Sequence, residues 1–202
     1  MAGVPPTAAH GPELVVLLDD AHRPVGVADK ATVHQASTPL HLAFSCYLFD
    51  DRDRLLVTRR STGKRTWPGV WTNTCCGHPA PGEPPEDAVR RRLRDELGVD
   101  VADLQVALPE FTYRERMDGV EENELCPVYL GRLVGTPQPD PSEVADLDRL
   151  GWEEYVAWTV QAPPGRGELS VWSRQQVRAL QSAGAVPDFL AATSGPASST
   201  TW

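Results

Sequence analysis

One stretch in the middle of the chain constrains the fold most: a loop that carries a thiol, a glycine and an imidazole, followed at once by an amphipathic helix. The loop, residues 73–83, contains Cys76-Gly77-His78. A helix is predicted from Pro84 to Gly98, because proline suits the first turn of a helix and glycine suits the left-handed position that ends it. The apolar residues of this segment recur every four positions, as a helix with one buried face requires: Val89, Leu93 and Leu97.

The spacing within this segment resembles the Nudix box, G-x5-E-x7-R-E-U-x-E-E-x-G-U, in which U is apolar. The matching residues are Gly77, Glu83, Arg91, Leu93, Asp95, Glu96, Gly98 and Val99. Arg92 and Asp95 depart from the box, since hydrolases of that family carry glutamate at both positions. Acidic residues on one side of such a helix hold hard divalent cations through oxygen. The arginine argues against hydrolysis and leaves the predicted fold unchanged.

Length and charge narrow the function classes. A chain of 202 residues with a net charge of −9 favours one globular domain and argues against a nucleic-acid binder, which needs a basic face. No apolar run reaches the roughly 18 residues that a membrane span needs, and residues 1–10 lack the pattern of a secretion signal. The four cysteines include the adjacent pair Cys75-Cys76 and do not suggest a disulfide framework, so we expect a reducing cytoplasmic setting.

We expect one domain over residues 13–184, with flexible tails over residues 1–12 and 185–202. Turn residues and alternating apolar residues predict a strand pair, Leu104–Tyr113 and Glu124–Leu133, joined across Asp118-Gly119. A helix is predicted over Trp172–Ser182. Further strands are predicted at Glu13–Leu18, Val25–Ala28, Leu40–Phe49 and Arg54–Arg59.

Five residues are candidate metal ligands. In a strand, Glu122 and Glu124 point to the same face, so they and the three histidines are able to form a site of two oxygens and three nitrogens: His34, His41 and His78. That donor mixture suits Mn²⁺, Fe²⁺, Zn²⁺ or Mg²⁺ better than Ca²⁺. The competing interpretation is a set of surface histidines beside a solvated acidic turn.

Other side chains are candidates for ligand binding and catalysis. Cys76 precedes a glycine and a candidate metal ligand in a loop at the start of a helix, a position that stabilises a reactive thiolate. The competing interpretation is a buried small apolar residue, which an isolated cysteine more often is. Four basic residues are candidates for phosphate binding: Lys30, Arg60, Lys64 and Arg92. If they converge in the fold, they would bind a phosphate. If they are scattered, they are only solvated surface residues. The face of a tryptophan such as Trp172 stabilises a carbocation.

Several long motifs together resemble type I isopentenyl-diphosphate isomerase over about residues 13–180. They are His34…His41-Leu-Ala-Phe-Ser, Leu56-Val-Thr-Arg-Arg60, Trp67-Pro-Gly-Val-Trp-Thr-Asn73, Cys76-Gly-His-Pro79, Arg91-Arg92, Glu96-Leu-Gly98 and Glu122-Asn-Glu-Leu-Cys-Pro127. The resemblance implies an α/β (α+β) Nudix fold, in which mixed sheets lie between helices. It also implies that the protein is an isomerase and not a hydrolase, which explains why Arg92 stands where Nudix hydrolases carry glutamate.

The resemblance implies roles for individual residues. Cys76 and Glu124 would be the acid/base pair, with Tyr113 hydrogen-bonded beside Glu124 and Trp172 over the reacting carbons. Glu96 and the carbonyl of Cys76 would hold a Mg²⁺ that bridges to the substrate diphosphate. A second ion, Mn²⁺, Mg²⁺ or Zn²⁺, would bind His34, His41, His78, Glu122 and Glu124, and the diphosphate would bind Lys30, Arg60, Lys64 and Arg92.

The implied reaction interconverts isopentenyl and dimethylallyl diphosphate through a tertiary carbocation, in isoprenoid biosynthesis. This chemistry needs one protonated and one unprotonated group on opposite faces of the substrate. Two alternatives are a Nudix-type pyrophosphohydrolase and a metal-binding interaction domain without catalysis. For the isomerase, we expect the protein to bind a small diphosphate and to bind neither nucleic acid nor a membrane. We also expect it to be a monomer.

Overall fold

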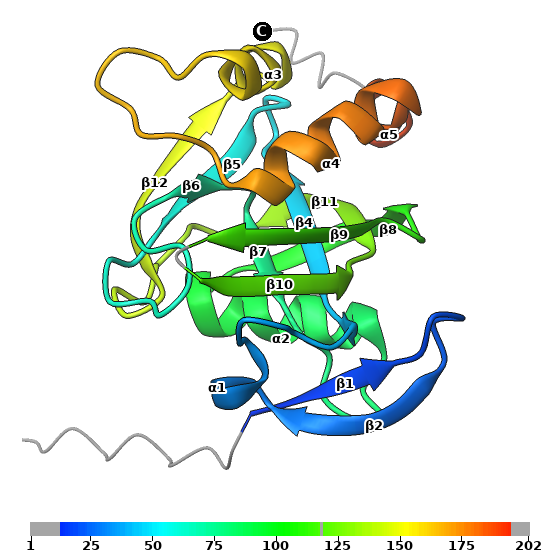
Figure 1. Cartoon of the computed structure of the whole chain (residues 1–202). Coiled ribbons are helices and arrows are strands. Elements are labelled where there is room, and N and C mark those ends of the chain that lie inside the picture. Colours follow the sequence, from blue (N-terminus) through cyan, green and yellow to red (C-terminus); the bar gives the residue numbers. More distant parts are fainter. Residues whose placement is uncertain (1–12, 118, 195–202) are drawn as a thin grey trace, which may run out of the picture.

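The computed structural model describes residues 13–117 and 119–194, which contain two mixed β-sheets (Figure 1). The smaller sheet has the strand order β2-β1-β3-β10-β9 and the larger one β12-β5-β4-β11-β8, with β6 paired to β5 and β7 to β4. The pairs β3–β10 and β4–β11 are parallel, and the other strand pairs are antiparallel. The strands are β1 (Leu14–Leu18), β2 (Pro24–Asp29), β3 (His41–Leu42), β4 (Phe44–Phe49), β5 (Leu55–Arg60), β6 (Trp71–Thr72), β7 (Cys75–Gly77), β8 (Asp100–Leu108), β9 (Thr112–Met117), β10 (Val120–Leu125), β11 (Val128–Val134) and β12 (Val144–Leu150).

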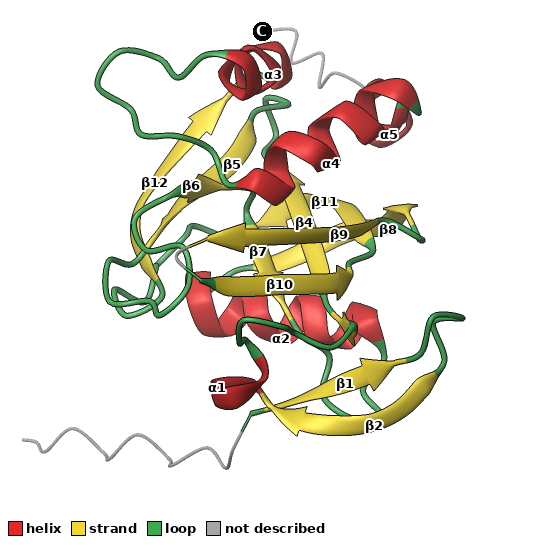
Figure 2. Cartoon of the chain, viewed as in Figure 1, coloured by secondary structure: helices red, strands yellow, loops and turns green. Residues whose placement is uncertain are grey.

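Helices α2 to α5 lie on the two faces of the larger sheet, whereas α1 lies beside the smaller one (Figure 2). Side chains of β4 alternate between these faces: Cys46 and Leu48 pack with the apolar stripe of α2, whereas Tyr47 and Phe49 pack with α3, α4 and α5. The helices are α1 (Lys30–Val33), α2 (Pro85–Leu97), α3 (Trp152–Val160), α4 (Val171–Ser182) and α5 (Ala185–Thr193). The predicted arrangement of mixed sheets between helices is confirmed.

Helix α2 has the ends that the sequence predicts. Pro85 occupies its first turn, and Gly98 ends it with a φ of 64°. The N–H of Gly98 donates to the carbonyl of Arg94 over 3.0 Å, and the N–H of Val99 donates to that of Leu93 over 3.3 Å. These bonds satisfy carbonyls that the helix itself leaves without a donor. The helix therefore stops where the chain must turn into β8.

The predicted strand pair at residues 104–133 crosses from one sheet to the other. The first predicted strand splits into β8 and β9, and the second splits into β10 and β11. Pro109 and Pro127 lie at the two breaks, because proline has no N–H to donate to a ladder. The hairpin is β9–β10, in the smaller sheet. Glu122 and Glu124 therefore belong to a different sheet from Cys76.

The flexible tail predicted from residue 185 is wrong for residues 185–193, which form α5. Val186 and Phe189 are buried in the core against the larger sheet, and Leu190 packs beside them. Their spacing is the helical signal that the small residues of this segment obscured. The predicted tails at 1–12 and 195–202 lie outside the described residues. Within the part of the chain that the structure describes, no helix is long and apolar enough to cross a membrane.

Candidate active site

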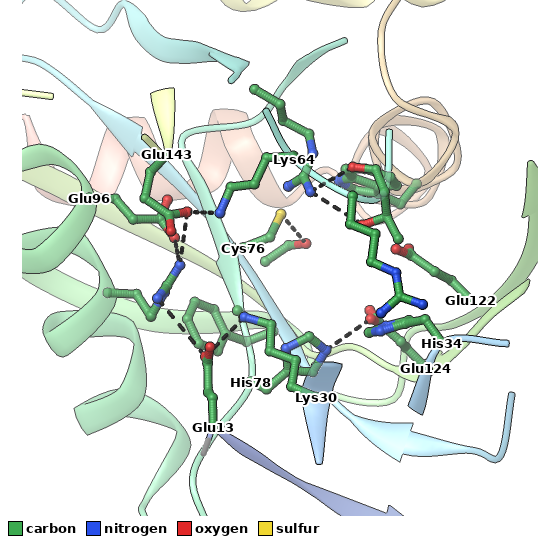
Figure 3. A pocket seen from close by; sticks show the side chains of 18 of the residues that line it. Glu13, Lys30, His34, Lys64, Cys76, His78, Glu96, Glu122, Glu124 and Glu143 are labelled. Atoms are coloured by element: carbon green, nitrogen blue, oxygen red, sulfur yellow. Dashed lines mark hydrogen bonds and ion pairs between the residues drawn. The ribbon is translucent and has the colours of Figure 1, made fainter. Parts of the chain in front are cut away.

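A cavity of about 520 Å³ receives side chains from both sheets and from α1, α2 and α4. Every predicted site residue lines this cavity except His41, which is fully buried beside His34 and His78. Figure 3 shows the sulfur of Cys76 between Glu96 and Glu143 on one side and Glu122, Glu124 and His34 on the other. The sequence motifs, although far apart along the chain, therefore converge on one place.

Four side chains converge as a metal-ligand group. One ligand atom from each lies within 4.8 Å of the others: His34, His41, His78 and Glu124. Glu124 Oε1 lies 3.2 Å from His78 Nε2 and 3.4 Å from His41 Nε2. Among the described residues, the buried Nε2 atoms of His34 and His41 have no hydrogen-bond partner. Buried unpaired nitrogens are costly, so three nitrogens and an oxygen at this spacing fit a divalent ion well.

Two of these side chains, His34 and Glu124, have the protonation state that suits a metal. Burial disfavours the charged form of His41, but Glu124 outweighs it and raises the pKa of that imidazole. Burial, together with the neighbouring imidazoles, lowers the pKa of His34 to about 4, so its ring is neutral at pH 7. Burial opposes ionisation of Glu124, but His41 and His78 outweigh it and hold the pKa of that carboxyl well below its usual range. A divalent ion binds neutral imidazole and ionised carboxylate.

Tyr113 ties two carboxylates together. Its hydroxyl lies 2.7 Å from Glu122 Oε2 and 2.8 Å from Glu124 Oε2, because β9 pairs with β10 and places Tyr113 opposite Glu124. Glu122 and Glu124 thus share a strand face, as alternation predicts. Burial and the charge of Glu124 raise the pKa of Glu122. Glu122 lies outside the group of four ligands, and its assignment as a fifth ligand stays a prediction.

Cys76 presents its sulfur to the cavity from β7. Its Sγ lies 3.2 Å from Asn73 Oδ1 and 3.3 Å from Ser45 Oγ. Burial raises the pKa of Cys76 to about 11, so the group is a neutral thiol at pH 7. The other three cysteines are buried: Cys46, Cys75 and Cys126.

Asn73 holds Cys76 and Trp172 in a fixed relation. Its Nδ2 donates to the carbonyls of Cys46 and Cys75 over 3.0 and 2.9 Å, which orients Oδ1 towards the other two side chains. Oδ1 accepts from Cys76 Sγ and, over 3.3 Å, from Trp172 Nε1. The prediction from sequence did not single out Asn73 or Ser45, because an asparagine or serine in a strand carries no chemical signature without its neighbours.

Trp172 lies in the first turn of α4, which begins at Val171. Ser170 precedes the helix, and its side chain accepts a hydrogen bond from the N–H of Ser173. The indole packs against Tyr113 with ring centroids 6.2 Å apart and against the edge of Trp67 at 5.7 Å. The guanidinium of Arg60 lies 5.8 Å from its centroid. These contacts form an aromatic wall of the cavity.

The predicted cations line the same cavity, and we call them the cation cluster: Lys30, Arg60, Lys64 and Arg92. Arg92 forms ion pairs with Glu96 and Glu143. It approaches β7 closely because Gly77 has no side chain; a Cβ there would lie 3.0 Å from Arg92 Cγ. Glu13 and Glu143, which also line the cavity, had no local signal in the sequence.

Known proteins are similar to this chain over most of its length. The model of the NUDIX domain family matches residues 39–172. An isopentenyl-diphosphate Delta-isomerase from Mycolicibacterium vanbaalenii is 58% identical over 173 residues, which are 85% of this chain and 93% of the relative. One from Frankia alni is 54% identical over 177 residues, or 87% of this chain and 90% of the relative.

Solved structures show the same fold at low sequence identity. A protein from Deinococcus radiodurans has a TM-score of 0.63 at 20% identity, covering 83% of this chain and 98% of its own. A MutT protein from Methanosarcina mazei Go1 has a TM-score of 0.56 at 17% identity, covering 73% and 96%. From these matches the chain belongs to the isopentenyl-diphosphate Delta-isomerase family, and its fold is that of a NUDIX domain.

Proposed function

We propose that this enzyme interconverts isopentenyl diphosphate and dimethylallyl diphosphate by adding a proton to one carbon and removing one from another. One observation carries the proposal: Cys76 and Glu124, from different sheets, line one cavity that also contains the cation cluster. A proton donor and a proton acceptor on separate walls are what this double-bond shift requires. The names of the relatives supply the substrate class.

In this proposal the cation cluster holds the diphosphate, and the five-carbon chain extends between Cys76 and Glu124. Tyr113 hydrogen-bonds Glu124 and keeps one of its oxygens in place. The indole of Trp172 covers the reacting carbons, where its face stabilises a tertiary cation and its bulk excludes water. Cys76 and Glu124 exchange their protonation states over the reaction.

We assign two metal sites to the chain. His34, His41, His78 and Glu124, with Glu122 as a further candidate, would hold Mn²⁺, Mg²⁺ or Zn²⁺. Glu96 and the carbonyl of Cys76 would hold a Mg²⁺ beside the cation cluster. The bound ions supply positive charge that fixes Glu124 and neutralises diphosphate oxygens. The buried unpaired imidazole nitrogens support the first site, and the position of Glu96 on the cavity wall supports the second.

The test is incubation with isopentenyl diphosphate and Mg²⁺ in D₂O, followed by NMR. We expect dimethylallyl diphosphate that carries deuterium. Release of phosphate would favour a pyrophosphohydrolase, and an unchanged substrate would indicate a binding domain without catalysis. We further infer a monomer with one catalytic domain that includes α5 and so extends from residue 13 to residue 193. It would work in a reducing cytoplasm that keeps its four cysteines free.

A further inference from the structure

Two carboxylates that the proposed reaction does not use occupy the cation cluster. Glu13 lies immediately before β1, and its Oε1 accepts from Lys30 Nζ over 2.9 Å and lies 4.0 Å from Arg92. Glu143 lies immediately before β12, and its Oε2 accepts from Lys64 Nζ and lies 3.3 Å from Arg92. In Figure 3, Glu13 reaches Lys30 and Glu143 reaches Lys64. Both carboxylates also approach the guanidinium of Arg92.

These ion pairs are more sheltered than ordinary surface pairs. The exposed fractions of the side chains are 12% for Arg92, 23% for Lys64 and 25% for Glu143. Charges in such a place interact more strongly than charges in open water. In the protein without ligand, three of the four cations are thus already paired with carboxylates.

The local charge balance is therefore close to neutral. Three cations, Lys30, Lys64 and Arg92, pair with three carboxylates, Glu13, Glu96 and Glu143, so their charges cancel at this end of the cavity. A diphosphate without a metal carries several negative charges and must displace carboxylates from the amines and the guanidinium. A diphosphate that carries Mg²⁺ has two fewer negative charges, and its ion is attracted by the same carboxylates.

One hydrogen-bond donor of Arg92 is not used by the described residues. Its Nε is buried and has no hydrogen-bond partner in the described part of the chain. A guanidinium is able to bind two acceptors in its plane. Arg92 lines the cavity, so a shift of its guanidinium that exposes Nε would let it bind a ligand oxygen without the loss of every carboxylate contact.

We propose that Glu13 and Glu143 are specificity residues that make the cation cluster select a Mg²⁺-bound diphosphate over a metal-free one. They compete with the metal-free ligand for Lys30, Lys64 and Arg92, and they favour the ligand that brings its own cation. This inference rests on the proposed function, which assigns the diphosphate to the cation cluster.

The test uses inorganic pyrophosphate as the probe and isothermal titration calorimetry as the readout. The full-length protein is first freed of metal, and its affinity for pyrophosphate is measured with and without Mg²⁺. Glu143→Gln keeps the shape of the side chain and removes its charge. Asp95→Asn is the matched control, because Asp95 lies on the outer face of α2, with 51% of its side chain exposed.

We expect Glu143→Gln to bind metal-free pyrophosphate about tenfold more tightly than the wild type, the order expected from removing one nearby half-buried charge. The preference for Mg²⁺-pyrophosphate should shrink by a similar factor, and Asp95→Asn should change neither. Glu13→Gln, at a more exposed position, gives a second reading if Glu143→Gln folds poorly.

Two outcomes would overturn the proposal. An unchanged preference for Mg²⁺ in both glutamine variants would show that the carboxylates do not select. An equal fall in the affinities for metal-free and for Mg²⁺-bound pyrophosphate would show that the two carboxylates only position the cations. A wild-type protein that binds no pyrophosphate in either condition would instead refute the proposed diphosphate site, so the two failures are distinguishable.

Discussion

Replacement of Asn73 by alanine tests how the walls of the cavity are held together. The Asn73 side chain is fully buried, and its amide makes hydrogen bonds to the backbone of β4 and β7 and to Cys76 and Trp172. Alanine would remove both donors to the carbonyls of Cys46 and Cys75. Trp172 Nε1 would keep one acceptor, the hydroxyl of Thr72 at 3.0 Å.

The expected loss of stability follows from these bonds. Each buried hydrogen bond contributes about 1 kcal/mol net, and a buried group left without a partner costs about 1–3 kcal/mol. Two lost donors and the weakened contacts at Oδ1 together predict a loss of about 2–4 kcal/mol. Against a total of roughly 5–15 kcal/mol for a typical domain, urea unfolding followed by circular dichroism resolves such a change.

Asn123→Ala is the matched control for this prediction. The Asn123 amide is only half-buried and donates one hydrogen bond, over 3.1 Å, to the carbonyl of Thr38. Its loss should cost about 1 kcal/mol or less. If the two variants lose equal stability, the buried amide of Asn73 is not the support that its contacts suggest.

Three further substitutions probe the site and its scaffold. Cys76→Ala should abolish turnover in the NMR assay while metal content by elemental analysis stays unchanged; wild-type rates would exclude the thiol. Gly131→Ala should cost about 1–3 kcal/mol in urea unfolding, because a Cβ there would lie 2.3 Å from Val101 Cγ2. Glu83→Gln should lower stability by about 1 kcal/mol at neutral pH, since the hydrogen bond from Arg91 lowers the pKa of Glu83 below 4.5. That contribution is complete above the unfolded pKa and disappears as pH falls through the lower folded value, so thermal melts of wild type and variant should converge in acid.

Local patterns explain which parts of the fold were predictable from the sequence. Helix α2 has its apolar stripe and both end signals within 15 residues, so no distant contact is needed to predict it. The break between β10 and β11 was missed because Glu124–Leu133 reads as one apolar-rich strand, and only tertiary pairing sends its two parts to different sheets. Helix α5 was missed because it contains Pro187 and because the small residues Ala185, Ala191 and Ala192 weaken its periodicity.

The same distinction holds for the candidate site. Residues inside distinctive motifs, such as Cys76 and His78, were predicted individually, and the structure brings them into one cavity. Glu13 and Glu143 stand alone in the sequence, about 130 positions apart. They come close to Arg92 only because strand pairing builds the two sheets. No local sequence pattern predicts that contact.

Position 92 shows how one substitution redirects a shared fold. Nudix hydrolases carry a glutamate here, on the same helix face as Glu96, where it adds a carboxylate to a metal site. In this chain Arg92 lies 3.3 Å from Glu143 and pairs with Glu96, so a ligand oxygen is replaced by a cation. The change removes a group able to bind a metal and its attacking water, and under the proposed function it would add a donor for the diphosphate itself. A site that grips the diphosphate without activating water beside it protects the phosphorus while the carbon chain reacts, which is the separation that an isomerase on this fold requires.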